Sequence, residues 1–207
     1  HVGHYSKYNY LEYELFRNNK LIGYHKYSFQ RNNGNLVIDN NVSFKIRKLG
    51  VDLYKYEAEG VEKYKNGVFL SFNSKTNQNK KKKYVNISVD PVDKNLIIDG
   101  SSFKGKASKE MIIGTWWNHE IVQKKAQISA VSGRIIEQKV EFIGKEEVVI
   151  GDKVYKTLRF NFSSSDPSLS KDKKLNTDIW YEESTYLWVK AAFDKTGYWE
   201  YRLKKAK

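Results

Sequence analysis

Apolar side chains recur at every second position along much of this chain. In the segment 42–47, Val42, Phe44 and Ile46 alternate with polar or charged residues. The same alternation runs through the segments 10–15, 85–89, 158–162 and 199–204. A period of two is that of a β-strand with one buried face, because neighbouring side chains on a strand point to opposite faces. We therefore predict an all-β fold: one large antiparallel sheet, curled into a barrel or folded into a sandwich that protects its edges.

Turn-forming residues separate these segments, and nothing divides the chain into two. Clear examples of such turns are Asn18-Asn19, Asn66-Gly67 and Gly151-Asp152. No internal repeat or linker is visible, so residues 1–207 are predicted to form a single domain. The main exception to the alternation is the apolar stretch 108–123, which is expected to be a short helix or a loop that crosses a face of the sheet.

Composition excludes several kinds of site. The chain has no Cys, which removes thiolate catalysis, Cys-ligated zinc, iron–sulfur clusters and disulfides. No apolar run approaches the ~20 residues of a membrane-spanning helix. His119 and Glu120 are adjacent and would face opposite sides of a strand, and neither a nucleophile elbow nor a phosphate-binding loop occurs. We predict neither a metal nor a cofactor.

The charge is strongly basic, with 37 Lys and Arg against 24 Asp and Glu and a net charge of +13. Only six of the 37 are Arg, the residue best suited to bidentate phosphate and base contacts, so no nucleic-acid partner is predicted. The densest cluster, Lys80–Lys83, is interpreted as a solvated hairpin loop. The alternative is a peripheral contact with an anionic membrane surface. The sequence leaves the oligomeric state open.

Several short motifs occur in an order that resembles a known bacterial family, domain of unknown function 6134. The matching strings are Leu21-Ile22-Gly23-Tyr24-His25, Tyr54-Lys55-Tyr56 with Glu62-Lys63-Tyr64, Trp117-Asn118, Ile179-Trp180-Tyr181, Leu187–Lys190 and Gly197–Leu203. The resemblance implies an exported, periplasmic all-β protein whose signal peptide has been removed, and it leaves open whether His1–His4 is native. It implies no activity.

His25 is the most informative single residue. On a regular strand it shares one face with Gly23, Tyr27 and Phe29. A histidine among aromatic side chains could be a general base or a neutral hydrogen-bonding anchor. The alternative is a core histidine that a neighbouring Tyr or Glu satisfies. Gly23 would leave room for a ligand or for a bulky aromatic residue of an adjacent strand.

Glu62 is the natural partner to consider for His25. It has the same strand parity as Tyr56 and Tyr64, which places it among aromatic side chains. A buried carboxylate needs a counter-group, since an isolated one would take up a proton. His25 would supply that group. An exposed glutamate beside Lys63 is the competing interpretation.

The preferred hypothesis for function is a non-catalytic module that binds a hydrophobic small molecule or lipid in an aromatic-lined cavity. Tyr13 and Tyr27 would contribute to its wall. The predicted ligand-binding residues are His25, Tyr56, Glu62, Trp117, Asn118, Trp180 and Tyr181. The alternatives are that these aromatics simply fill a thick core, or that the protein is a hydrolase or isomerase. The enzyme would need His25 and Glu62 within about 3–4 Å of each other or of one pocket, as an acid/base pair.

Overall fold

The structure is a computed structural model, and it describes residues 6–207. The described chain is built almost entirely of strands, with one short 3₁₀-helix, η2 (His119–Gln123). The strands are β1 (Tyr10–Arg17), β2 (Lys20–Asn32), β3 (Asn35–Lys48), β4 (Val51–Lys65), β5 (Val68–Gln78), β6 (Lys81–Val89), β7 (Leu96–Gly100), β8 (Lys104–Ala107), β9 (Ile112–Ile113), β10 (Ala126–Ile128), β11 (Ile135–Ile150), β12 (Lys153–Ser164), β13 (Asn176–Glu182), β14 (Trp188–Asp194) and β15 (Tyr198–Ala206).

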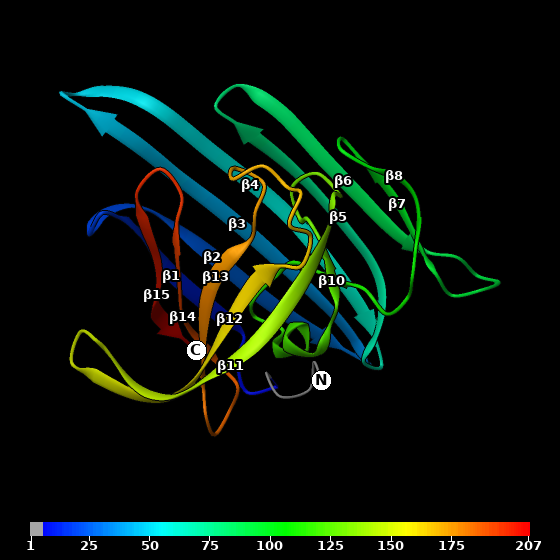
Figure 1. The fold of residues 1–207 in the computed structure, drawn as a ribbon. Helices are drawn as coiled ribbons and strands as arrows, with labels where there is room; N and C mark the ends of the chain where they lie inside the picture. Colours follow the sequence, from blue (N-terminus) through cyan, green and yellow to red (C-terminus); the bar gives the residue numbers. More distant parts are fainter. Residues whose placement is uncertain (1–5) are drawn as a thin grey trace.

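All fifteen strands belong to one sheet, in the order β8-β7-β6-β5-β4-β3-β2-β1-β15-β14-β13-β12-β11-β10-β9. Neighbours are antiparallel except β9 and β10, which are parallel. The chain passes from β1 through successive hairpins to the β8 edge, crosses to the β9 edge, and then winds back to β15. The first and last strands are therefore neighbours in the middle of the sheet (Figure 1). The prediction of one large antiparallel sheet is confirmed.

Short turns with left-handed backbone join many of the hairpins. Two-residue turns of this kind match the right-handed twist of the flanking strands, but they require a positive φ at both central residues. Asn and Gly adopt that conformation more readily than other residues. The pairs used here include Asn18-Asn19, Asn33-Gly34 and Asn66-Gly67. Local sequence thus specifies where the sheet reverses direction.

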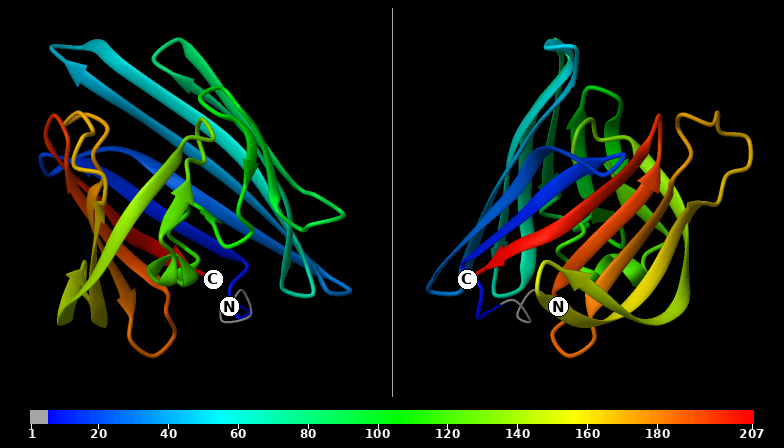
Figure 2. Two further views of the ribbon diagram at one scale, coloured as in Figure 1. Left: turned by 45° about the vertical axis from the view of Figure 1, so that its right-hand side comes forward. Right: turned by 90° about the vertical axis from the view of Figure 1, so that its left-hand side faces the viewer.

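The sheet is curled on itself without closing, with β8 and β9 as its edges (Figure 2). The backbones of β2 and β3 approach each other closely at Gly23. A Cβ atom at Gly23 would lie 2.0 Å from the carbonyl oxygen of Ser43 and 2.5 Å from the Cβ of Phe44. Phe44 packs edge-on against Trp199 of β15, with 5.2 Å between ring centroids, although β1 and β2 lie between their strands in the sheet order. Gly23 therefore accommodates a bulky aromatic residue of the adjacent strand.

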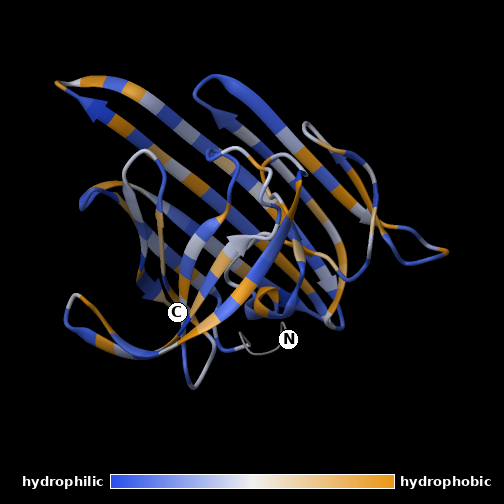
Figure 3. Cartoon of the chain, in the orientation of Figure 1, coloured by the Kyte–Doolittle hydropathy of each residue, from blue (hydrophilic) through white to orange (hydrophobic). Residues whose placement is uncertain are grey.

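The segment 108–134, which contains η2, lies inside the curl and covers the inner face of the sheet (Figures 1 and 2). Hydrophobic and hydrophilic residues alternate along many of the long strands (Figure 3). One core cluster joins β1–β4 to β12–β15 around Trp117 and Trp188, and a second joins β5–β8 to Ile113 and Ile128. The expected short helix or loop near 108–123 is confirmed, and it closes the core that the open sheet alone would leave exposed.

Candidate functional site

Glu62 lies at the centre of a buried polar network on the inner face of β4. Its side chain is fully buried, with 0% of its surface exposed. Its Oε1 accepts a hydrogen bond from the indole Nε1 of Trp117 at 3.1 Å, and its Oε2 accepts one from the hydroxyl of Tyr64 at 2.9 Å. Thr115 also donates to the carboxylate. Burial raises the pKa of Glu62 to about 7, although these three donors favour the charged form.

The network fixes the interior segment to the sheet. Trp117 packs edge-on against Phe29 and Tyr64, with ring centroids 5.5 Å and 6.3 Å away. The side chain of Asn118 accepts a hydrogen bond from the backbone N–H of Glu120 at 3.2 Å and so caps η2. Glu62 and Trp117 are thus in direct contact within a packed core, and Asn118 follows Trp117 at the start of η2.

His25 lies on the same inner face as Glu62 but well away from it. His25 is paired with Val42 on β3, whereas Glu62 on β4 is paired with Ile38. Ile38 in turn pairs with Phe29, four residues beyond His25 on β2. This register separates the two side chains by about 13 Å along the strands and about 10 Å across them. The structure does not bring His25 and Glu62 together, so they form no acid/base pair by direct contact.

The imidazole of His25 is enclosed by aromatic rings. It stacks on Tyr27 at 4.4 Å between centroids, and the rings of Trp188 and Tyr201 lie edge-on at 6.4 Å and 6.1 Å. Both ring nitrogens are buried, and neither has a hydrogen-bonding partner among the described residues. Burial lowers the pKa of His25 to about 3, which keeps the ring neutral at physiological pH. A neutral imidazole offers one donor and one acceptor, and here both are unused.

Beyond His25, toward the β3–β4 turn, the inner face carries a band of aromatic rings in mutual contact. We call the following six residues the aromatic band: Phe44, Tyr54, Tyr56, Phe193, Trp199 and Tyr201. Phe44 stacks on Tyr56 at 4.8 Å, and Phe193 stacks on Trp199 at 5.7 Å. Five of the six rings are only partly buried, the exception being Phe44. The band is therefore an aromatic inner surface that is open to solvent only in part.

The remaining predicted residues divide between the two faces of the sheet. Tyr181 is buried in the interior, where its hydroxyl donates to the carbonyl of Trp116 at 2.7 Å. Trp180 points to the opposite face, where the guanidinium of Arg159 and the ammonium of Lys190 lie 4.8 Å and 4.6 Å from its ring. Of the seven residues predicted to bind a ligand, only His25 and Tyr56 lie at the aromatic band.

A cavity of about 350 Å³ lies where β2 and β3 diverge. Their pairing ends at Gly23 and Phe44, although both strands continue, and the cavity occupies the fork between them. We call it the fork cavity. Its lining combines apolar residues with cations: Arg17, Lys20, Leu21, Ile22, Gly23, Tyr24, Ser43, Phe44, Lys45, Ile46 and Arg47. Phe44 belongs to both the cavity and the aromatic band, so the two are adjacent.

A larger hollow of about 800 Å³ lies mainly on the outer face of β2–β6. Its outward-facing residues include Glu57, Glu59, Lys75 and Lys82, a mixture of both charges. Within residues 6–207 no three His, Asp or Glu side chains are grouped so that they could hold a metal ion. The same part of the chain contains no helix that is long and apolar enough to cross a membrane.

The comparisons with known proteins agree with this architecture. The family model for a domain of unknown function, DUF6134, matches residues 13–204. The chain belongs to the DUF6134 family. A search of curated proteins found no match. Among solved structures, this DUF6134 chain is similar to a β-barrel-like protein of the domain of unknown function DUF1849 from Brucella abortus, with a TM-score of 0.66, 10% sequence identity and 96% of each chain covered. At that identity the likeness concerns the fold alone.

Proposed function

We propose that this DUF6134 protein binds an elongated apolar molecule that carries one neutral polar group. The apolar part would lie along the aromatic band, and the polar group would hydrogen-bond to His25. The observation that carries the proposal is the imidazole of His25, whose two buried nitrogens have no partner among the described residues and which adjoins partly exposed aromatic rings. A buried polar group without a partner is rare in proteins and costs free energy, so it calls for an explanation.

The chemistry of the band favours an apolar chain over a sugar or a charged molecule. The faces of Phe44 and Phe193 are already stacked on Tyr56 and Trp199, which leaves ring edges and part of the faces for a ligand. Burial raises the pKa of Tyr56 to about 12, which indicates a poorly solvated surface. A charged group placed there would lose its hydration without gaining a counter-ion. A fatty alcohol meets these requirements.

The fork cavity provides a route to this surface. It is bounded by Phe44, the central ring of the band, and by the apolar side chains of Leu21 and Ile46. An acyl chain that enters between the diverging strands would contact Phe44 first and His25 further along the same face. We also propose that the protein is exported, as the family resemblance implies. Fractionation of the source cells tests this.

The proposal is tested with 1-decanol, a chain with a single neutral hydroxyl. Purified protein is first extracted with organic solvent, and the extract is examined for copurifying lipids. Calorimetric titration then measures decanol binding to the wild type, to His25→Phe and to Trp180→Phe. Trp180→Phe is the matched control, because Trp180 is an aromatic residue on the opposite face of the sheet.

Saturable binding of decanol to the wild type and to Trp180→Phe is expected. His25→Phe should bind about fivefold more weakly, since the loss of one hydrogen bond is worth about 1 kcal/mol. Equal affinity of His25→Phe and the wild type would remove His25 from the site, and absence of saturable binding to the wild type would overturn the proposal.

A further inference from the structure

The turn between β3 and β4 ends a two-stranded ribbon that extends beyond its neighbours. The pairing of β3 with β2 ends at Phe44, and the pairing of β4 with β5 ends at Tyr56. Residues 45–55 therefore pair only with each other, and not with β2 or β5. We call this ribbon the β3–β4 arm. It extends about 13–17 Å beyond the paired part of the sheet, at about 3.3 Å per residue, and its projection is visible in Figures 1 and 2.

The tip of the arm carries a leucine in a conformation that leucine disfavours. Leu49 has a φ of 52° and Gly50 one of 77°, so the turn is left-handed at both central residues, and Leu49 is also 95% exposed. Four other turns have two successive φ values between 47° and 79°, and each uses Asn at the first position: Asn18-Asn19, Asn33-Gly34, Asn66-Gly67 and Asn79-Lys80. An asparagine in place of Leu49 would suit this turn better, so folding does not account for the leucine.

More exposed apolar residues follow Leu49 along the arm. Val51 is 60% exposed and Leu53 is 55% exposed. Scattered single apolar residues on a surface need no explanation, but three within five residues at a projecting tip form a small apolar patch. The patch is convex and narrow, so it offers no groove in which a peptide could bind.

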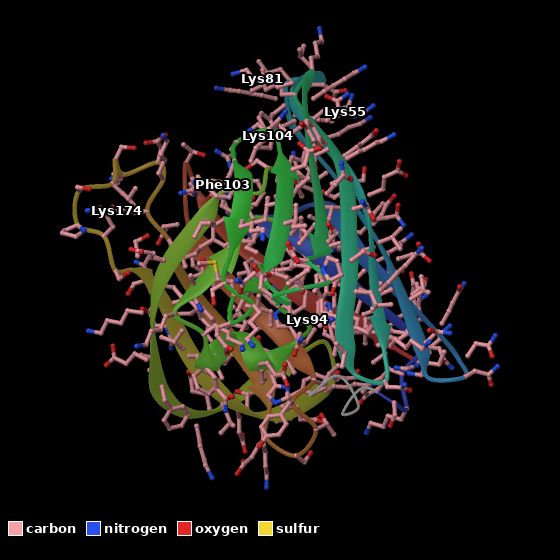
Figure 4. The ribbon with its side chains drawn as sticks, turned by 90° about the vertical axis from the view of Figure 1, so that its right-hand side faces the viewer. Lys55, Lys81, Lys94, Phe103, Lys104 and Lys174 are labelled. Atoms are coloured by element: carbon pink, nitrogen blue, oxygen red, sulfur yellow. The ribbon has the colours of Figure 1, made fainter. Side chains whose placement is uncertain are left out.

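Basic side chains lie along the arm and at its base. Four cations and one acid lie in the arm: Lys45, Arg47, Lys48, Lys55 and Asp52. The adjacent β5–β6 turn brings Lys80–Lys83 to the same end of the molecule, since the backbone N–H of Asn79 donates to the carbonyl of Lys55 at 2.7 Å. Figure 4 shows Lys55 and Lys81 together at this end, far from Lys94. The arm and its base thus carry a net positive charge, which Asp52 and Glu57 offset in part through ion pairs with Arg47 and Lys55.

We propose that the β3–β4 arm docks on an anionic lipid bilayer, with Leu49 and Val51 inserted among the acyl chains and the surrounding cations against the headgroups. Apolar insertion combined with attraction of Lys and Arg to anionic headgroups is the usual basis of peripheral membrane binding. The projection of the arm allows Leu49 to reach the acyl boundary while the rest of the sheet stays in water. The arm adjoins the fork cavity, because Lys45, Ile46 and Arg47 line that cavity.

Vesicle flotation tests this proposal, with the full chain and two compositions: pure phosphatidylcholine, and phosphatidylcholine with phosphatidylglycerol. The decisive variant is Leu49→Asn, which produces the Asn-Gly sequence preferred in such turns and should therefore keep or raise the thermal stability. Val92→Asn is the matched control, because Val92 is 89% exposed on the β6–β7 loop, outside the arm. Lys81→Glu combined with Lys82→Glu alters charge beside the arm without touching its apolar tip.

The wild type and Val92→Asn are expected to float with the anionic vesicles, and to do so far less with pure phosphatidylcholine. Leu49→Asn should bind at least about tenfold more weakly, in line with the transfer free energy of a leucine side chain. The double Lys variant should weaken binding by up to about fivefold per cation, and the effect should shrink as the salt rises from about 0.1 M to about 0.5 M.

Full binding by Leu49→Asn would overturn the proposal, because attraction of the lysines alone would then explain flotation. Absence of binding to anionic vesicles by the wild type would also overturn it. Decanol binding is measured without vesicles, so failure of membrane docking and failure of the proposed ligand site are distinguished.

Discussion

Glu62 and His25 give opposite pH dependences to the stability of the folded protein, and exchanging each of them in turn should reveal both. The pKa of Glu62 is raised from 4.5 to about 7 by burial, and that of His25 is lowered from 6.5 to about 3 by burial. The two perturbations are Glu62→Gln, which keeps the shape and a carbonyl acceptor for the Trp117 indole, and His25→Phe, which keeps a ring. Neither replacement can titrate.

The change in stability with pH has the opposite sign for the two groups. A raised pKa in the folded state means that Glu62 contributes stability below pH 4.5, and that this contribution is lost as the pH rises to about 7. A lowered pKa means that His25 contributes stability above pH 6.5, which is lost as the pH falls toward 3. Each pH unit of difference between folded and unfolded pKa values is worth about 1.4 kcal/mol.

When the pH falls from about 8 to about 5, the contribution of Glu62 to the free energy of unfolding therefore rises by about 2–3 kcal/mol. That of His25 falls by about 2 kcal/mol. The two contributions nearly cancel in the wild type. Relative to the wild type, the free energy of unfolding of Glu62→Gln should fall by about 2–3 kcal/mol on going from pH 8 to pH 5, and that of His25→Phe should rise by about 2 kcal/mol.

Urea unfolding of the three proteins at both pH values, followed by tryptophan fluorescence, measures these differences. The comparison with the wild type at each pH removes the contributions of all other titrating groups. Changes below about 0.5 kcal/mol for both variants, or changes of the opposite sign, would refute the assignment of these two side chains to a poorly solvated interior.

Other substitutions test the packing around these residues. Gly23→Ala should destabilise the fold by about 2–4 kcal/mol in urea, because the new Cβ would meet the Ser43 carbonyl oxygen at 2.0 Å; a loss below about 1 kcal/mol would show that β3 can move away. Trp117→Phe should cost about 2 kcal/mol at pH 5 and more at pH 8, because the Glu62 carboxylate loses a buried donor; equal losses at both pH values would contradict this. Trp180→Phe should cost about 1 kcal/mol or less by thermal denaturation, because the ring keeps its place beside Arg159, and a larger loss would indicate a role for the indole N–H.

The strand content and a curled sheet were both predicted from the sequence, whereas the open form of the curl was not. Alternation in segments such as 42–47 identifies the buried face of a strand, because the side-chain period depends only on the backbone. The contact between Phe44 and Trp199 depends on the close approach at Gly23 and on the coiling of two intervening strands. Those are non-local properties, and alternation is the same in a barrel, a sandwich and an open curl.

For the candidate site too, the sequence indicated which residues share a strand face but not which of them lie close together. Strand parity grouped His25 with Tyr27 and left Glu62 either buried or exposed. The distance between the two side chains depends on the pairing registers of β2 with β3 and β3 with β4. Trp180 and Tyr181 are adjacent on one strand, so their opposite directions were already contained in the sequence. The β3–β4 arm also had a signal, since Leu49-Gly50 stands at a position where the other turns of this kind carry Asn.

The most direct test of the central claim, that the aromatic band holds an apolar chain, is tryptophan quenching by 10-bromo-1-decanol. Bromine quenches an indole only at close range, and 1-decanol of the same length serves as the unbrominated control. This mode of binding predicts saturable quenching in the wild type and in Trp180→Phe, and much weaker quenching in Trp199→Phe. Absence of quenching at saturating ligand, or undiminished quenching in Trp199→Phe, would contradict it.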